Sequence, residues 1–381
     1  MPFHLYFHLP YCRRKCPYCD FYKIVPKKGE RERFVSALTR EVSMAEMSHS
    51  WANGPAGTVY FGGGTPSLHP PREIHALLTE VRRVWKIAAQ AEITLEANPG
   101  ALTPEFLCGW REAGVNRLSL GAQSFSPRKL ALLFRDHRPE DTVRSVENAR
   151  AAGFSNISLD LIFGLPDETL EEWTADLNAA YSLNADHVSL YNLEFHPGTP
   201  FHRWKEAGRL KPLSGDFEAD LYLAAHEFFA ARGFEHYEIS NFARPGFRSR
   251  HNLAYWESKP YVGLGPSAHS FDGQALRFHN AADMNRYLSA LDSGRLPIEK
   301  ELLLSENERA EEWIWLSLRR AEGIDFDAAC AHLGEPSARA LWNCASQLPS
   351  GLCEITPRTF RLTPEGWFRE DSVLLWLFCT D

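Results

Sequence analysis

Short apolar runs alternate with amphipathic stretches over the first half of the chain. The apolar runs are rich in β-branched and aromatic residues, and most end at Gly, Pro or Asn, which is typical of buried strands. They span residues 2–9, 58–64, 92–99, 117–125, 157–166 and 187–195. In the stretches between them apolar residues recur at helical spacing. These predicted helices span residues 30–46, 73–84, 104–113, 141–152 and 170–183.

The alternation of strands and helices predicts an α/β fold, with a parallel sheet covered by helices. Six such units predict a (β/α)6 partial barrel, a curved relative of the eight-unit TIM barrel. In barrels of this type the chemistry lies at the carboxyl ends of the strands. The unusual glycine and polar motifs of this sequence all follow apolar runs, so we expect the functional site at that end of the barrel.

The pattern changes after about residue 235. Residues 236–271 are rich in Arg, His, Asn and aromatic residues. Beyond them we expect helices at 306–320 and 325–333, then a strand, a turn and a last helix in 360–378. The sequence therefore predicts a core domain at 1–235, a connecting segment at 236–280 and a smaller, mainly helical or winged-helix-like C-terminal domain at 281–381.

Composition and charge narrow the class of protein. The chain has 381 residues, 44% of them hydrophobic and 24% charged, which is ordinary for a globular protein. A net charge of −8, with no basic face in evidence, disfavours a nucleic-acid partner. No apolar run approaches the roughly 20 residues of a membrane span, and the first residues lack the basic start of a signal peptide. We therefore expect a cytoplasmic protein.

Three of the eight cysteines are clustered in a CxxxCxxC motif formed by Cys12, Cys16 and Cys19. Three thiolates on one short loop can bind three corners of a [4Fe–4S] cluster, and the fourth iron is then open because no further cysteine lies nearby. The basic residues between Cys12 and Cys16 favour thiolates and an anionic cluster. The alternative is a structural zinc site, for which His4 or His8 is the candidate fourth ligand.

A CxxxCxxC motif after the first strand of a βα repeat resembles the radical-SAM superfamily. The glycine-rich segment 62–66 follows the second strand and is similar to that family's glycine motif. The resemblance implies S-adenosylmethionine (SAM) at the open iron, cleaved by one electron to a 5′-deoxyadenosyl radical. The residues that it assigns to SAM binding are Tyr6, Gly63, Gly64, Thr65, Glu96, Gln123, Arg135 and Asp160. For each alone, a structural polar role is the alternative.

Over nearly the whole chain the sequence resembles the oxygen-independent coproporphyrinogen III oxidase group, and within it the HemW-type haem chaperones. Two features favour the chaperone branch. Phe21 stands where the oxidase has a fourth cysteine, close to the cofactor site, and residues 251–256 read HNLAYW, which matches the HNxxYW motif of that branch.

The segment that contains HNLAYW has the residues that haem binding requires. His251 offers an imidazole for the iron, and the arginines of 244–250 offer guanidinium groups for the propionates. The alternative is that His251 is a hydrogen-bonded histidine in a folded linker. Further candidate ligands are His236, His269, His279 and the cysteines outside the CxxxCxxC motif.

The resemblance implies a haem chaperone that binds haem or a porphyrin and delivers it to respiratory haem proteins, including acceptors at the membrane surface. It further implies an electron donor such as a flavodoxin or ferredoxin, and it is compatible with a homodimer. The alternative activity is that of an oxygen-independent coproporphyrinogen III oxidase. We assign no catalytic residue from the sequence. An RNA-modifying role is disfavoured because the chain has no basic face.

Overall fold

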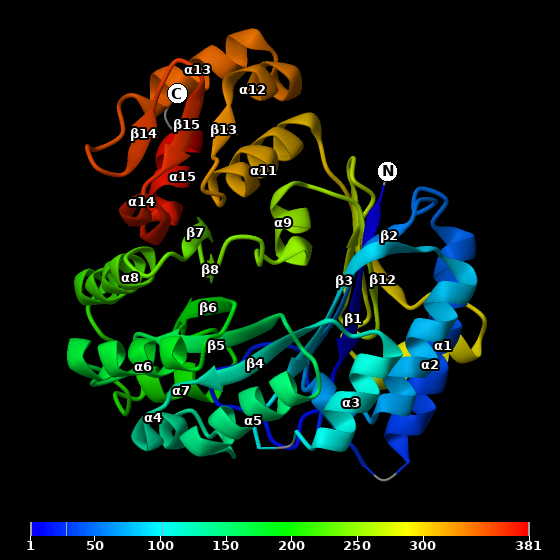
Figure 1. The fold of residues 1–381 in the computed structure, drawn as a ribbon. Helices are drawn as coiled ribbons and strands as arrows, with labels where there is room; N and C mark the ends of the chain where they lie inside the picture. Colours follow the sequence, from blue (N-terminus) through cyan, green and yellow to red (C-terminus); the bar gives the residue numbers. More distant parts are fainter. Residues whose placement is uncertain (1, 28, 101, 380–381) are drawn as a thin grey trace.

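A computed structural model describes residues 2–27, 29–100 and 102–379 of the chain (Figure 1). Within these residues, six parallel strands in sequence order form the centre of a 12-stranded sheet. They are β1 (Phe3–Leu9), β2 (Ala56–Gly63), β3 (Ile87–Ala97), β4 (Arg117–Gln123), β5 (Ile157–Phe163) and β6 (His187–Asn192). Each overlaps one of the six predicted runs, so the (β/α)6 partial barrel is confirmed.

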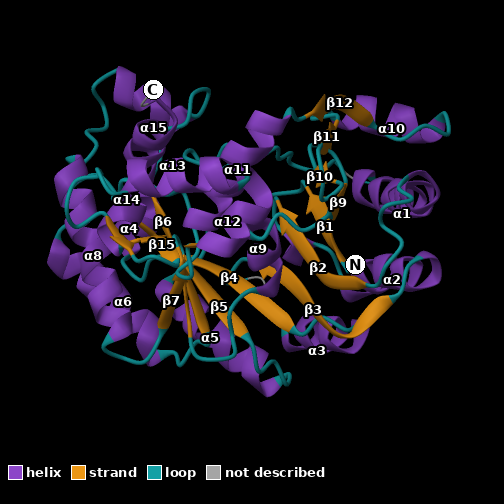
Figure 2. Ribbon diagram, turned by 90° about the horizontal axis from the view of Figure 1, so that it is seen from above, coloured by secondary structure: helices purple, strands orange, loops and turns teal. Residues whose placement is uncertain are grey.

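Helices in the connections cover the outer face of the curved sheet (Figure 2). Between the six strands lie α1 (Glu30–Ser48), the short 3₁₀ helix η1 (Pro66–Leu68), α2 (Pro71–Val84), α3 (Pro104–Ala113), α4 (Pro127–Leu132), α5 (Pro139–Ala151) and α6 (Leu170–Ser182). Two more, α7 (Pro200–Glu206) and α8 (Gly215–Ala230), follow β6. Several of these helices begin at a proline, whose fixed φ suits the first helical position. All five helices expected in this region are present.

The two faces of the barrel sheet differ in chemistry. On β1, Phe3, Leu5 and Phe7 are buried in the apolar core beneath the helices. The alternate residues face the interior, where His4 Nδ1 lies 2.9 Å from Thr58 Oγ1 of β2. Similar cross-strand hydrogen bonds join Tyr60 to Glu96, Ser119 to Asp160 and Ser158 to His187. The outside of the barrel is therefore apolar, and its inside is a network of polar side chains.

Shorter strands extend the sheet at both edges. Beside β1 lie β9 (Tyr261–Leu264), β10 (His269–Phe271), β11 (Leu276–Asn280) and β12 (Ile298–Leu303). Beside β6 lie β8 (Asn241–Ala243) and β7 (Glu235–Glu238). Two helices, α9 (Arg250–Trp256) and α10 (Met284–Asp292), connect these edge strands. Much of the segment that follows residue 235 thus belongs to the large sheet.

The C-terminal part is mainly helical, as predicted, and contains a 3-stranded antiparallel sheet in the order β13-β15-β14. Its elements are α11 (Glu306–Leu318), β13 (Ile324–Asp325), α12 (Phe326–Leu333), α13 (Glu335–Ala345), β14 (Cys353–Ile355), β15 (Thr359–Leu362), α14 (Pro364–Phe368) and α15 (Glu370–Cys379). This part lies near the amino-terminal ends of the barrel strands, next to α9 (Figure 1). Across the described ranges, no helix is long and apolar enough to cross a membrane.

Candidate cofactor site

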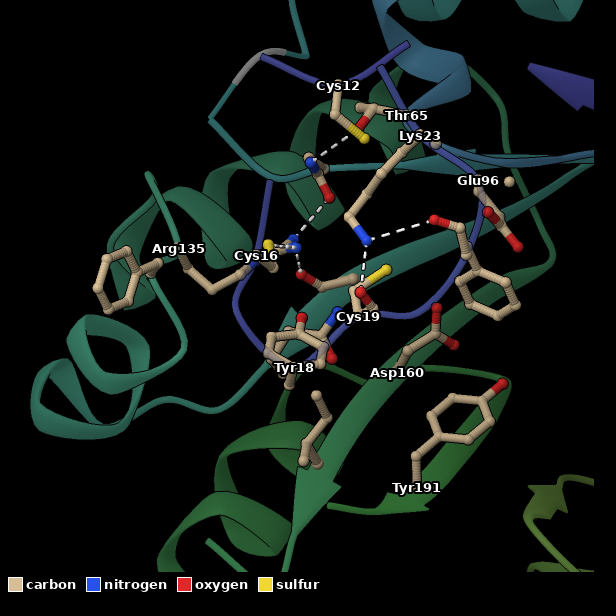
Figure 3. Close-up of a pocket in the computed structure, with 18 of the residues that line it drawn as sticks. Cys12, Cys16, Tyr18, Cys19, Lys23, Thr65, Glu96, Arg135, Asp160 and Tyr191 are labelled. Carbon is tan, nitrogen blue, oxygen red and sulfur yellow. Dashed lines mark hydrogen bonds between the residues drawn. The ribbon is translucent and has the colours of Figure 1, made fainter. Parts of the chain in front are cut away.

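The three clustered cysteines lie on a closed loop between β1 and α1. Its two ends are joined by backbone hydrogen bonds from Cys12 N to Ile24 O and from Ile24 N to Pro10 O, both 2.9 Å. Inside the loop, Lys23 Nζ donates to the carbonyl of Cys19 (2.5 Å), as Figure 3 shows. These bonds fix the shape of the loop, and all three thiols reach the same pocket.

That pocket lies at the carboxyl ends of the barrel strands and has a volume of about 370 Å³. Every residue that the sequence assigned to the cluster or to SAM lines it, except Tyr6. The residues concerned are Cys12, Cys16, Cys19, Phe21, Gly63, Gly64, Thr65, Glu96, Gln123, Arg135 and Asp160. They come from the cysteine loop, from the carboxyl-terminal parts of β2 to β5 and, for Arg135, from the connection between α4 and α5. Parallel strands bring their carboxyl ends to one edge, which explains why these residues meet.

The glycine segment that follows β2 packs directly on the cysteine loop. Gly64 N donates to Leu9 O (2.9 Å) and Thr65 N to Tyr11 O (2.8 Å). A Cβ atom on Gly64 would lie 2.6 Å from the Pro10 carbonyl carbon, and one on Gly63, whose φ is +104°, would lie 2.7 Å from the His8 ring. Glycine is therefore required at both positions, and the bare backbone faces the pocket.

Two carboxylates lie on the inner wall of the pocket. Glu96 accepts a hydrogen bond from Tyr60 Oη (2.9 Å), and Asp160 accepts from Ser119 Oγ (3.0 Å). Burial, together with the charge of Asp160, raises the pKa of Glu96 to about 7. Burial likewise raises the pKa of Asp160. Buried carboxylates with free acceptor capacity suit ligand groups that donate, such as an ammonium or ribose hydroxyls.

Arg135 brings a positive charge to the thiols. Its guanidinium donates to Asn98 Oδ1 (2.5 Å) and to the Gly121 carbonyl (2.8 Å), and its Nη1 lies 4.0 Å from Cys16 Sγ. The preceding residue, Phe134, has a φ of +55°. A bulky residue in this region is strained, and such strain is commonly retained at functional sites.

The donor set fits an iron–sulfur cluster better than zinc. Among the described residues, no group of three or more His, Cys, Asp or Glu side chains is arranged to hold one metal ion. The three thiols nevertheless line one pocket, as expected when each binds a different iron. His8, a candidate fourth zinc ligand, has both ring nitrogens in hydrogen bonds, one to Tyr6 Oη (3.2 Å) and one to Tyr22 O (2.8 Å).

Two predicted site residues lie away from the pocket. Tyr6 is on the inner face of β1, where its ring stacks on Tyr60 at 6.1 Å between centroids, beside the pocket rather than in it. His251 lies on α9, near the amino-terminal ends of the strands. The structure therefore separates the HNxxYW motif from the cysteine loop.

His251 has no free nitrogen to offer iron in this conformation. Its Nδ1 is 2.6 Å from Thr58 Oγ1, its Nε2 is 2.9 Å from Tyr255 Oη, and the side chain is fully buried. Burial lowers the pKa of His251 well below its usual value, so the ring is neutral at pH 7. The structure thus favours the alternative, a hydrogen-bonded structural histidine, over haem ligation by His251.

Hydrogen bonds at both ends of α9 also hold this helix in place. Glu92 of β3 accepts hydrogen bonds from the backbone amides of Arg250 and His251, both 3.1 Å. At the other end of the helix, Trp256 Nε1 donates to Glu238 (2.9 Å). These bonds hold α9 across the amino-terminal end of the barrel.

Sequence reasoning missed several residues of the pocket. Tyr18 lies within the cysteine motif, and Lys23 sits among the thiols with its amine bonded to the loop carbonyls. Tyr191 lies near the carboxyl end of β6, and Asn98 directly follows β3. The sequence signal that could have found them was their position toward the carboxyl ends of predicted strands or inside the cysteine loop.

Comparisons with known proteins agree with this geometry. Residues 6–180 match the Radical SAM superfamily, and residues 304–369 match the HemN C-terminal domain. The protein named Heme chaperone HemW from Bacillus subtilis is 36% identical over 84% of this chain and 84% of its own. The chain belongs to the HemW family of radical-SAM proteins.

Other members of the HemW family are similar over comparable lengths. The Escherichia coli protein is 39% identical over 72% of this chain and 73% of its own, and the Mycobacterium tuberculosis H37Rv protein is 35% identical over 98% and 94%. The solved structure of coproporphyrinogen III oxidase (HemN) from Escherichia coli, described as a radical SAM enzyme, covers 99% of this chain and 90% of that chain. It has a TM-score of 0.84 at 23% identity, which establishes the common fold. Membership of the radical-SAM superfamily implies a [4Fe–4S] cluster and SAM.

Proposed function

We propose that this protein is a haem chaperone, which binds haem and delivers it to respiratory haem proteins. The observation that carries the proposal is the 35–39% identity to proteins named Heme chaperone HemW from several bacteria. The cysteine loop agrees with it, since Phe21 occupies the position of the oxidase's fourth cysteine and 63% of this residue is exposed at the pocket.

The second candidate function is oxygen-independent coproporphyrinogen III oxidase. The fold is that of the oxidase, whose solved structure covers 99% of this chain. At 23% identity, however, the likeness to the oxidase supports the fold and not its reaction. We therefore rank the chaperone first.

Under this proposal, Cys12, Cys16 and Cys19 hold the cluster. When bound, the cluster and SAM supply one-electron radical chemistry. The backbone at Gly63 and Gly64 lets the methionine part of SAM approach without side chains between. Glu96 and Asp160 accept hydrogen bonds from its donors, and Arg135 offsets the negative charge of the thiolates.

The expected partners follow from the same proposal. They are an electron donor such as a flavodoxin or ferredoxin, and haem-protein acceptors, including acceptors at the membrane surface. We place the protein in the cytoplasm, where thiols stay reduced and an open cluster persists. We propose no nucleic-acid partner, and a homodimer is compatible with the proposal.

Two assays on one anaerobically reconstituted preparation test the proposal. Haem titration should give a saturable change in the Soret absorption at about one haem per chain, as for one binding site. Incubation with coproporphyrinogen III, SAM and a reductant should give no protoporphyrinogen. Robust turnover without saturable haem binding would reverse the ranking.

A further inference from the structure

His196 stands at the mouth of the cofactor pocket, in the loop between β6 and α7. Within the described ranges it is the one histidine that lines this pocket. Its side chain is 38% exposed. The loop thus presents an imidazole to the same opening that the cysteine loop borders.

Two carboxylates lie near the ring of His196, and among the residues that the structure describes no hydrogen bond holds its Nδ1. Its Nε2 lies 3.2 Å from Glu194 Oε2, while its Nδ1 lies 3.9 Å from Asp20 Oδ2, too far for a hydrogen bond. A carboxylate close to one ring nitrogen of a histidine favours metal binding through the other nitrogen. By contrast, His236 is bonded to His226 (2.9 Å) and Tyr222 (3.3 Å), and both ring nitrogens of the buried His251 are hydrogen-bonded.

Exposed aromatic residues border the same opening. Phe21 is 63% exposed and Phe134 is 45% exposed, and both line the pocket. Phe134 also has the strained φ of +55° noted above. Retaining a strained, exposed phenylalanine at a pocket mouth points to a planar apolar ligand that covers it.

The opening also carries unpaired positive charge. Arg13 and Arg14 of the cysteine loop line the pocket and are exposed. Neither forms an ion pair with any residue that the structure describes, in contrast to most arginines of this chain. Guanidinium groups bind carboxylates strongly, in bidentate geometry.

We propose that His196 binds the iron of haem at the mouth of the cofactor pocket, with Phe21 and Phe134 against the macrocycle and Arg13 and Arg14 at the propionates. This inference rests on the proposed haem-chaperone function and identifies the residue that binds the haem iron. It differs from ligation by His251, and from ligation by His269 and His279, whose rings lie 5.0 Å apart on the edge strands β10 and β11.

The test is haem titration of the full-length, cluster-loaded protein. His196→Ala should weaken haem binding at least about tenfold and shift the Soret maximum, since the iron loses a nitrogen ligand. His202→Ala, on α7 and outside the pocket, is the matched control and should bind as the wild type does. Glu194→Gln should weaken binding up to about tenfold while keeping the wild-type spectrum.

Two further variants separate ligation from a structural role. Adding imidazole to His196→Gly should restore the wild-type Soret spectrum, and His196→Cys should give the spectrum of thiolate-bound haem. If the wild type binds haem saturably but His196→Ala binds it with unchanged affinity and spectrum, the inference fails and the proposed function stands. If the wild type shows no saturable binding, the proposed function fails first, and this inference with it.

Discussion

We expect truncation of His251 to lower the stability of the protein by loosening α9 from the amino-terminal end of the barrel, and not to remove a haem ligand. In His251→Ala the hydrogen bonds to Thr58 Oγ1 (2.6 Å) and Tyr255 Oη (2.9 Å) are lost. The loss of two buried hydrogen bonds lowers the free energy of unfolding by about 2 kcal/mol. Removing a packed ring, which stacks on Tyr60 at 4.9 Å, adds about 2 kcal/mol more. We therefore expect the free energy of unfolding to fall by about 4 kcal/mol.

That loss is a large share of the roughly 5–15 kcal/mol that stabilises a typical domain. The measurement is urea denaturation followed by circular dichroism, together with hydrogen exchange of the α9 amides, which should accelerate. His75→Ala, at an exposed position of α2, is the control and should change stability by less than about 0.5 kcal/mol. Wild-type stability of His251→Ala combined with loss of haem binding would refute the reasoning, because it would make the ring a ligand.

The remaining predictions concern the cluster, SAM and pH. Cys16→Ser should lose the iron of the cluster, from about four per chain, yet keep its circular dichroism spectrum, because the thiol lines a pocket and not the core. Glu96→Gln should weaken SAM binding to the cluster-loaded protein about tenfold, as measured by equilibrium dialysis; unchanged affinity would remove Glu96 from the site. Burial lowers the pKa of His4 and of His8 to about 4, so both are neutral in the folded state and charged in the acid-unfolded chain. Their contribution to stability is present above pH 6.5 and is lost as the pH falls toward 4, so urea midpoints should decrease across that window.

The barrel could be predicted because its strands are long and buried on a helix-covered face. Each of β1 to β6 carries enough apolar and β-branched residues to stand out from the chain. Most edge strands were missed because they are shorter than the barrel strands. The longest of them was missed because it is largely polar. This strand, β12 (Ile298–Leu303), reads IEKELL, and it is a strand only because β11 pairs with it.

The pocket could be predicted for a geometric reason, since polar residues that follow parallel strands must meet at one edge. The place of His251 could not be predicted, because the sequence HNLAYW does not reveal that Glu92 and Thr58 hold its helix. The position of His196 could not be predicted either. Its loop lies beside the cysteine loop in the folded protein, although the two loops are far apart in the sequence.

Helix α9 lies across the amino-terminal end of the barrel, and the cofactor pocket lies at the carboxyl end, beside the thiols. If haem binds over this pocket as proposed, it would lie between SAM and solvent, so SAM would leave only after haem had left.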